Sequence, residues 1–223
     1  MTLNEVMNQE RTALLGESVF RSPSGMQLMP YAAVTNPQVL QRTPEFLRSA
    51  HPVALTDLSA RDRRMAFVQV CPSLKYKFLW VHSDNNDYRS DYRSYLRQHQ
   101  NVTEALPESL HVDHLYNRER AKRLGTPFIR LVLCPRGINT SHGAGIEKKR
   151  TLSGLGRYGR EHKMDDIILL KLCGLPSPRT GQPLTPEMVA HIHAIALLYG
   201  MNAEEIQASI QSLIDVANFV PDR

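Results

Sequence analysis

The hydrophobic and polar positions of this chain follow two periods, which separate predicted strands from predicted helices. Short apolar runs predict strands at 75–81, 110–115 and 128–134, with weaker β-like runs at 18–20 and 26–34. Apolar positions recurring every three or four residues predict helices at 3–15, 36–49, 56–70, 84–100, 164–173, 185–200 and 202–216. This mixture of elements predicts an α+β fold.

The segment 84–100 contains the tandem DYRS-DYRS and supports two interpretations. On a helix, Tyr88, Tyr92 and Tyr95 share one face, and the arginines of the same repeats line another. Either this aromatic and basic surface lies along nucleic acid, or the tyrosines pack into the core and the arginines are solvated. We favour the packing interpretation.

Charge is unevenly distributed along the sequence. The 223 residues carry a formal net charge of +5 and give a pI of about 9.2, which favours a polyanionic partner. Between positions 111 and 163 there are 12 Lys or Arg residues and only 4 acids. We therefore expect DNA or RNA as the partner. The expected phosphate contacts are Arg118, Lys122, Arg136, Lys148, Lys149 and Arg157.

The cysteines and the N-terminal residues bear on the compartment. Cys71, Cys134 and Cys173 are too few and too widely spaced for a disulfide framework or a CxxC zinc knuckle, and they fit a reducing compartment. The first residues include acids and lack the apolar core of a Sec signal, and no apolar run approaches membrane-spanning length. We expect a cytoplasmic protein without a membrane partner, with signal-independent export left open.

A candidate active site lies between positions 110 and 149. Asp113 and His114 lie near the end of one apolar run, while Asn139 and His142 are one turn apart at a predicted helix start after the next. Phosphodiester hydrolysis needs a base, a Lewis acid and positive charge near the phosphate. His114 is the natural base, and Asp113 with Asn139 offers oxygen ligands to a hard cation. Because adjacent strand residues point to opposite faces, Asp113 and His114 need a bulge or a strand end to act together.

These residues resemble the HNH or His-Me finger (ββα-metal) endonucleases, closest to the branch of phage endonuclease VII-type resolvases. The resemblance covers about forty residues and implies His114 as the general base. It also implies Asp113, Asn139 and His142 as ligands of Mg²⁺ or Mn²⁺, with Zn²⁺ less favoured. The chain departs from the family pattern by a long insertion with a predicted basic helix at 117–124, and by lacking the CxxC pairs that often brace the finger.

The predicted organisation is a ββα-metal core with a basic loop at 105–163, flanked by two further regions. Residues 1–104 form a mixed α/β region without an assigned role, and residues 164–223 form a helical region packed on the core. The last two helices predict a hairpin that is structural or contacts a protein partner. The predicted function is metal-dependent cleavage of DNA, or of RNA, with weak sequence specificity. A toxin, phage-defence or mobile-element nuclease fits this description by fold-level analogy.

Two other interpretations use the same residues. In the first, positions 113–114 are a buried hydrogen-bonded pair that fixes a strand end, and the chain binds nucleic acid or assembles without cutting. In the second, His111, His114 and His142 form a zinc site. Glu147 lies between lysine-rich and glycine-rich sequence and is interpreted as a solvated helix-surface residue.

Overall fold

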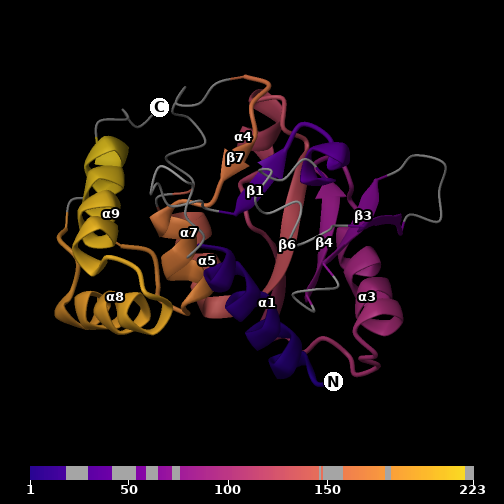
Figure 1. Cartoon of the computed structure of the whole chain (residues 1–223), viewed down its shortest axis with the longest axis horizontal. Coiled ribbons are helices and arrows are strands. Elements are labelled where there is room, and N and C mark those ends of the chain that lie inside the picture. Colours follow the sequence, from indigo (N-terminus) through magenta and orange to yellow (C-terminus); the bar gives the residue numbers. More distant parts are fainter. Residues whose placement is uncertain are drawn as a thin grey trace.

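The computed structural model describes residues 1–18, 30–41, 54–58, 65–71, 76–145, 147, 158–178 and 182–218. Strands of both halves of the chain meet in the middle of the molecule, and helices pack around them (Figure 1). The elements in chain order are α1 (Leu3–Ser18), β1 (Tyr31–Val34), the 3-10 helix η1 (Pro37–Gln41), β2 (Ala54–Asp57), β3 (Ala66–Cys71), β4 (Tyr76–His82), α3 (Tyr88–His99), β5 (Leu110–His114), α4 (Arg118–Arg123), β6 (Phe128–Pro135), α5 (Arg136–Ala144), β7 (His162–Lys163), α7 (Asp166–Leu172), α8 (Pro186–Tyr199) and α9 (Ala203–Asn218). The α+β class predicted from the hydrophobic pattern is confirmed.

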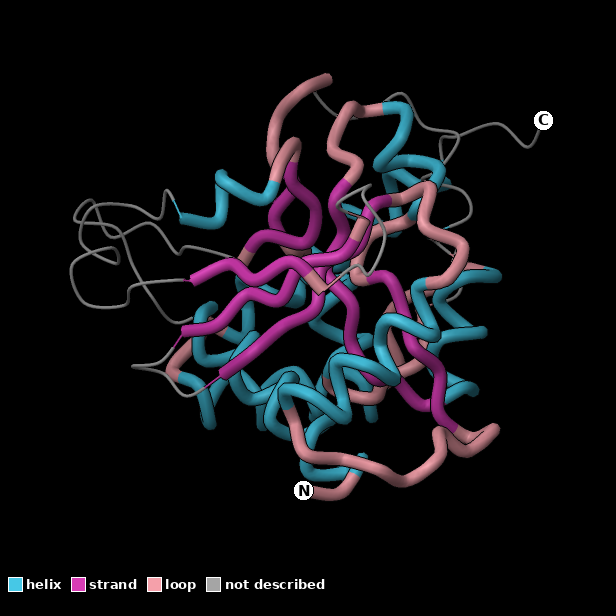
Figure 2. Tube along the Cα trace, turned by 90° about the vertical axis from the view of Figure 1, so that its right-hand side faces the viewer, coloured by secondary structure: helices cyan, strands magenta, loops and turns pink. Residues whose placement is uncertain are grey.

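Strand β6 is the centre of the sheet, which has the order β2-β3-β4-β6-β1-β7 with β5 also paired to β6. Residues 128–130 of β6 pair with β4, and positions 128–129 also pair with β1. Residues 131–135 pair instead with β5, and all these pairings are antiparallel. Residues 129–134 are buried in succession because both faces of β6 are covered. Figure 2 shows the strands side by side through the molecule, with helices packed around them.

Helix α1 is fixed to β6 through a buried carboxylate. Glu10 is only 2% exposed, and its Oε1 accepts a hydrogen bond of 2.6 Å from the hydroxyl of Tyr92 on α3. Its Oε2 accepts one of 2.9 Å from the backbone N–H of Leu133, beyond the part of β6 that pairs with β4. The side chain therefore satisfies a buried backbone donor that the sheet leaves open.

Helix α3 confirms the packing interpretation of the DYRS segment for Tyr92 and Tyr95. Tyr92 and Tyr95 are fully buried, and the Tyr95 hydroxyl donates a 2.8 Å hydrogen bond to the carbonyl of Lys77 on β4. The face they form packs on β3, β4 and β6 in one of the hydrophobic clusters of the core. Tyr88, in the first turn, is only partly buried and lies at the candidate site described below.

The C-terminal helices form the predicted hairpin. Thr185 caps α8 by accepting a hydrogen bond from the backbone N–H of Met188, and Gly200 ends the helix in a left-handed conformation with φ of 63°. Helix α9 packs on α8 and on α7 through a third hydrophobic cluster. Within the described ranges, none of the helices combines the length and the apolar character needed to cross a membrane.

The helix predicted at 56–70 is wrong. The two ends of this segment form strands β2 and β3, which pair antiparallel from Ala54 opposite Val70 to Asp57 opposite Phe67. Residues 66–69 are buried in succession because β3 lies between β2 and β4 with both faces covered. A short apolar run of this kind fits a buried strand as well as a buried helix, so periodicity alone does not separate them.

Two other predictions are confirmed only in part. Asn36 begins a helix as predicted, with its Oδ1 accepting from the backbone N–H of Val39 at 3.3 Å, but the turn is the 3-10 helix η1. The β-like run at 26–34 ends in β1, whereas Ser18 belongs to α1. The predicted segments 19–20, 26–29, 42–49 and 59–64 lie outside the described residues.

The burial of Glu10 predicts a pH-dependent stability. Burial raises the pKa of this carboxyl from 4.5 to about 7, so folding favours its protonated form. Its contribution is therefore fully present below pH 4.5 and is lost as the pH rises through about 7, with an amplitude of about 3 kcal/mol. Glu10→Gln mimics the protonated form and is expected to flatten this part of the pH–stability curve.

Urea unfolding at a series of pH values measures this effect. Glu108→Gln, in an exposed turn, is the matched control and is expected to follow the wild-type curve. A Glu10→Gln curve that stays parallel to wild type between pH 4.5 and 7 would contradict the prediction.

Candidate functional site

The strand, strand, helix order expected in the candidate site is present in the fold. Strands β5 and β6 pair without interruption, from Leu110 opposite Pro135 to His114 opposite Leu131. Helix α5 begins at Arg136, directly after the last residue of β6. The predicted basic helix in the insertion is also present as α4, which is capped by the side chain of Asn117. The backbone arrangement implied by the resemblance is therefore found at 110–144.

The pairing of β5 places Asp113 and His114 on opposite faces. No bulge interrupts the register up to His114, and the backbone N–H of Leu115 still donates to the carbonyl of Arg130 at 2.9 Å. The ring of His114 packs on Tyr88 of α3 with 4.5 Å between ring centroids. Asp113 points instead toward α7. The expectation that a bulge or strand end lets the two side chains act together is wrong.

Asp113 belongs to a buried ion-paired cluster that the sequence analysis missed. The ammonium Nζ of Lys171 on α7 lies 2.7 Å from Oδ2 of Asp113 and 2.9 Å from Oε1 of Glu147. The Lys171 side chain is 2% exposed, and those of Asp113 and Glu147 are 11% and 19% exposed. We call these three residues the Lys171 cluster. The interpretation of Glu147 as a solvated surface residue is wrong.

The charges of the cluster reinforce one another. Burial raises the pKa of Asp113 to about 6, although the ammonium of Lys171 acts against this shift. Burial alone would lower the pKa of Lys171, but Asp113 and Glu147 outweigh it and hold the pKa above its usual value. Lys171 therefore carries a fixed positive charge inside the protein. A single lysine in the apolar segment DIILLKLC is the sequence signal for such a cluster, because a buried charge needs a partner.

Asn139 pairs with His111 rather than with Asp113. Because α5 begins at Arg136, Asn139 lies inside the helix and is not its first residue as predicted. Its Nδ2 lies 3.3 Å from Nδ1 of His111, which shares the α5-facing side of β5 with Asp113. Burial and the charges of Arg136 and Arg89 lower the pKa of His111, so the neutral ring accepts the amide hydrogen.

His142 is a structural residue of α5. The ring is fully buried, and its Nε2 lies 2.9 Å from the carbonyl oxygen of Leu175, to which it donates. This bond ties α5 to the segment after α7. Its Nδ1 is buried without a hydrogen-bond partner. His142 and Asn139 have different partners in this structure, and the ligation of a metal by His142 stays a prediction.

The predicted metal ligands do not fit Mg²⁺ or Mn²⁺ in this arrangement. Asp113 is paired with an ammonium, the Asn139 amide with a histidine, and His142 with a backbone carbonyl. Among the residues that the structure describes, no group of three His, Cys, Asp or Glu side chains is placed to hold a metal ion. The zinc alternative fails for the same reason, because His111 and His114 lie on opposite faces of β5.

Arg89 acts on both histidines of β5, Arg118 acts on His114 and Arg136 acts on His111, and we call these three arginines the arginine rim. They come from α3, α4 and α5. Burial, then the charges of Arg118, Lys171 and Arg89, lower the pKa of His114 to about 3. Arg118 donates from two nitrogens to the carbonyl of Ser83, at 2.9 and 2.6 Å, which fixes its position.

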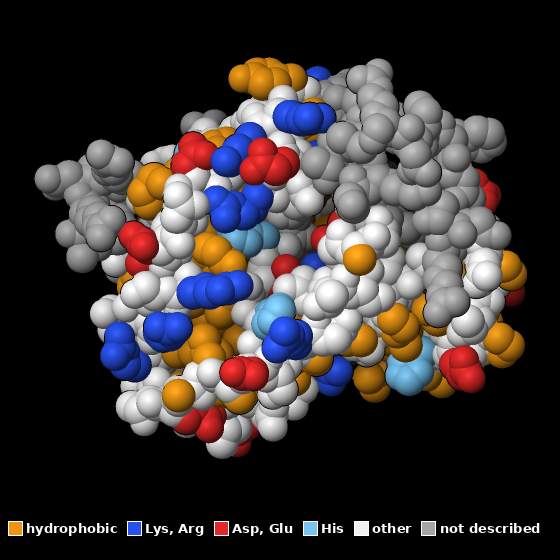
Figure 3. All heavy atoms as spheres, turned by 180° about the vertical axis from the view of Figure 1, so that it is seen from behind, with side chains coloured by type: hydrophobic (Ala, Val, Ile, Leu, Met, Phe, Trp, Pro, Cys, Tyr) orange, Lys and Arg blue, Asp and Glu red, His pale blue; other side chains and the backbone are white. Residues whose placement is uncertain are grey.

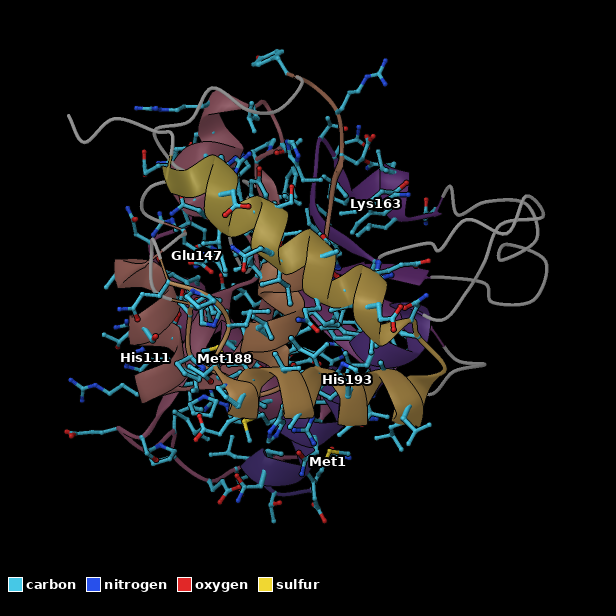
Figure 4. All side chains as sticks on the ribbon, turned by 90° about the vertical axis from the view of Figure 1, so that its left-hand side faces the viewer. Met1, His111, Glu147, Lys163, Met188 and His193 are labelled. Carbon is cyan, nitrogen blue, oxygen red and sulfur yellow. The ribbon has the colours of Figure 1, made fainter. Side chains whose placement is uncertain are left out.

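Aromatic contacts complete this face. The guanidinium carbons of Arg89 and Arg118 lie 5.5 and 5.8 Å from the centroid of the Tyr88 ring. Figure 4 places His111 and Glu147 on the same side of the molecule, beside α5. Figure 3 views the molecule from behind and shows Lys, Arg and His side chains around a hollow where acidic side chains are visible.

The predicted phosphate contacts divide into three groups. Arg118 and Arg136 belong to the arginine rim. Lys122 is paired with Asp84 at 2.9 Å and with Glu119 at 3.5 Å, so it is less available to phosphate. Lys148, Lys149 and Arg157 lie outside the described residues. Arg89 was not among the predicted contacts, although the DYRS repeat marked its helix.

Comparison with known proteins adds no constraint. No family model, curated protein or solved structure matches this chain. Any link with the ββα-metal endonucleases therefore depends on the residues and backbone order at 110–144.

The Lys171 cluster predicts a large stability effect. Lys171→Met leaves two partly buried carboxylates without their cation, and removal of one partner from a buried ion pair typically costs about 3–5 kcal/mol. Urea unfolding at neutral pH measures this loss. Lys122→Met is the matched control and is expected to stay close to wild type, because its ion pairs are exposed. Equal stability of the two variants would rule out the proposed importance of the cluster.

Proposed function

We propose that this chain hydrolyses phosphodiester bonds of nucleic acid, DNA being the first substrate to test. The reaction takes place on the face formed by β5, α5 and the first turn of α3. The observation that supports this most directly is the arginine rim. Arg89 and Arg118 approach the ring of Tyr88, which packs on His114, while Arg136 acts on His111 at the other face of β5.

Three like charges near one strand favour an anionic ligand. Guanidinium groups are planar and bind phosphate oxygens through paired hydrogen bonds. Tyr88, whose ring both Arg89 and Arg118 approach, offers a surface on which a base or sugar can pack. Contacts of this kind read the backbone and ring faces rather than base edges, so weak sequence specificity is expected.

His114 is the proposed general base. Its lowered pKa keeps the ring neutral at physiological pH, so that a ring nitrogen retains its lone pair. A phosphate bound at the arginine rim offsets the positive charges that lower this pKa, which raises the proton affinity of the ring when substrate is present. The ring then accepts a proton from the attacking water as the water oxygen bonds to phosphorus and the P–O bond to the leaving sugar oxygen breaks. The leaving oxygen takes up a proton from solvent, and the arginine rim stabilises the charge that develops on the phosphate.

A second candidate function is binding without cleavage. It is favoured by one observation, the separation of Asp113 and His114 onto opposite faces of β5. In that case the arginine rim holds nucleic acid and no bond is broken. Cleavage assays distinguish the two functions.

His114→Ala is expected to reduce nicking of supercoiled plasmid by a factor of about 100 or more, because a positioned base contributes about 10²–10⁴-fold. His191→Ala, on the exposed face of α8, is the control and is expected to keep wild-type activity. Agarose gels follow nicking with Mg²⁺, with Mn²⁺ and with EDTA. Equal nicking by both variants would exclude His114 as the base. DNA binding without nicking in any buffer would support the second candidate.

Arg89→Ala is expected to weaken DNA binding and to lower the salt dependence of the affinity by about one counterion. Fluorescence anisotropy with a labelled duplex at several salt concentrations measures both quantities. Arg97→Ala, near the other end of α3, is the matched control. If the two variants lose the same affinity, the arginine rim is not the binding surface.

A further inference from the structure

We infer that the ammonium of Lys171 takes the place of a divalent cation between Asp113 and Glu147. As long as Lys171 is present, this site binds no metal ion. When its charge is removed, the two carboxylates become a divalent-cation site.

The geometry of the Lys171 cluster supports this inference. The ammonium lies 2.7 Å from Oδ2 of Asp113, as an ion pair, and donates a charge-assisted hydrogen bond of 2.9 Å to Oε1 of Glu147. Carboxylate oxygens from Asp and Glu are also the ligands that Mg²⁺ and Mn²⁺ prefer. The two acids therefore bracket a position for a hard cation, and an ammonium already fills that position.

The placement of Lys171 in α7 makes its ammonium difficult to displace. Residues 167–170, which precede it in the helix, are all buried, so the backbone at Lys171 is held inside the protein. A divalent ion entering the site would have to displace the ammonium while its side chain remains 2% exposed. Leaving a charged amine without partners in such surroundings is costly.

A consequence for catalysis rests on the proposed function. If the chain cleaves DNA, the positive charge near Asp113 comes from Lys171 and the arginine rim. Nicking by the wild-type protein is then expected to continue in EDTA. Metal binding, however, is measured without any substrate, so a failure of the proposed function and a failure of this inference give different results.

The test uses Mn²⁺ alone, titrated into the full chain and followed by isothermal calorimetry. The wild type and Asp113→Asn are expected to show the same weak background. Lys171→Met is expected to gain a saturable Mn²⁺ site that is lost in the double variant Lys171→Met/Asp113→Asn. Mn²⁺ should also raise the Tm of Lys171→Met and leave that of the wild type unchanged.

Two results would overturn the inference. One is saturable Mn²⁺ binding by the wild type that Asp113→Asn removes. The other is a Lys171→Met protein that gains neither binding nor thermal stabilisation from Mn²⁺. Where Lys171→Met does not fold alone, folding on addition of Mn²⁺ supports the inference. Lys171→Gln, which keeps a hydrogen-bond donor, is titrated in parallel as the milder variant. Absence of nicking in every buffer would overturn only the proposed function.

Discussion

The ion pairs of Lys171 with Asp113 and Glu147 constrain the whole candidate site. A charge in the interior must be balanced where it lies, so the lysine fixes α7 against β5 and against the residue at 147. Asp113 is thereby committed to the α7 side of β5. The regular β5–β6 pairing then leaves His114 on the opposite side, against α3. One buried cation and an uninterrupted strand together determine which side chains can cooperate.

Strand β6 is the second constraint, because it connects regions that are distant in the sequence. Its first residues pair with β4 and β1, and its last residues pair with β5. Strands from residues 1–104 and 105–163 thus share one sheet. Glu10 extends this link by bonding α1 to both β6 and α3. The candidate site is built on a sheet to which the N-terminal part of the chain contributes directly.

The sequence predicted the helices and strands better than the contacts between their side chains. Capping residues and strong periodicity correctly located α1, α8, α9 and the strands β4, β5 and β6. Asp113, His114 and Asn139 were correctly placed in a strand, strand, helix unit, but the contacts of their side chains depend on residues far along the chain. Lys171, for example, is 58 positions from Asp113, and no local pattern encodes their contact. The prediction of a helix over the apolar segment 66–70 was wrong for a different reason. Burial on both faces of the strand removes the alternation of apolar and polar residues that identifies a strand.

The insertion between β5 and β6 has a consequence for how this hairpin can vary. Arg118 at the start of α4 is anchored to the turn after β4 through the carbonyl of Ser83, and Lys122 is paired with Asp84 in the same turn. These contacts hold the insertion against the turn that follows β4. Shortening it to the length of a simple two-strand finger would remove the anchor along with the guanidinium it positions. In relatives of this chain, a shorter β5–β6 insertion is expected to occur together with a changed turn after β4.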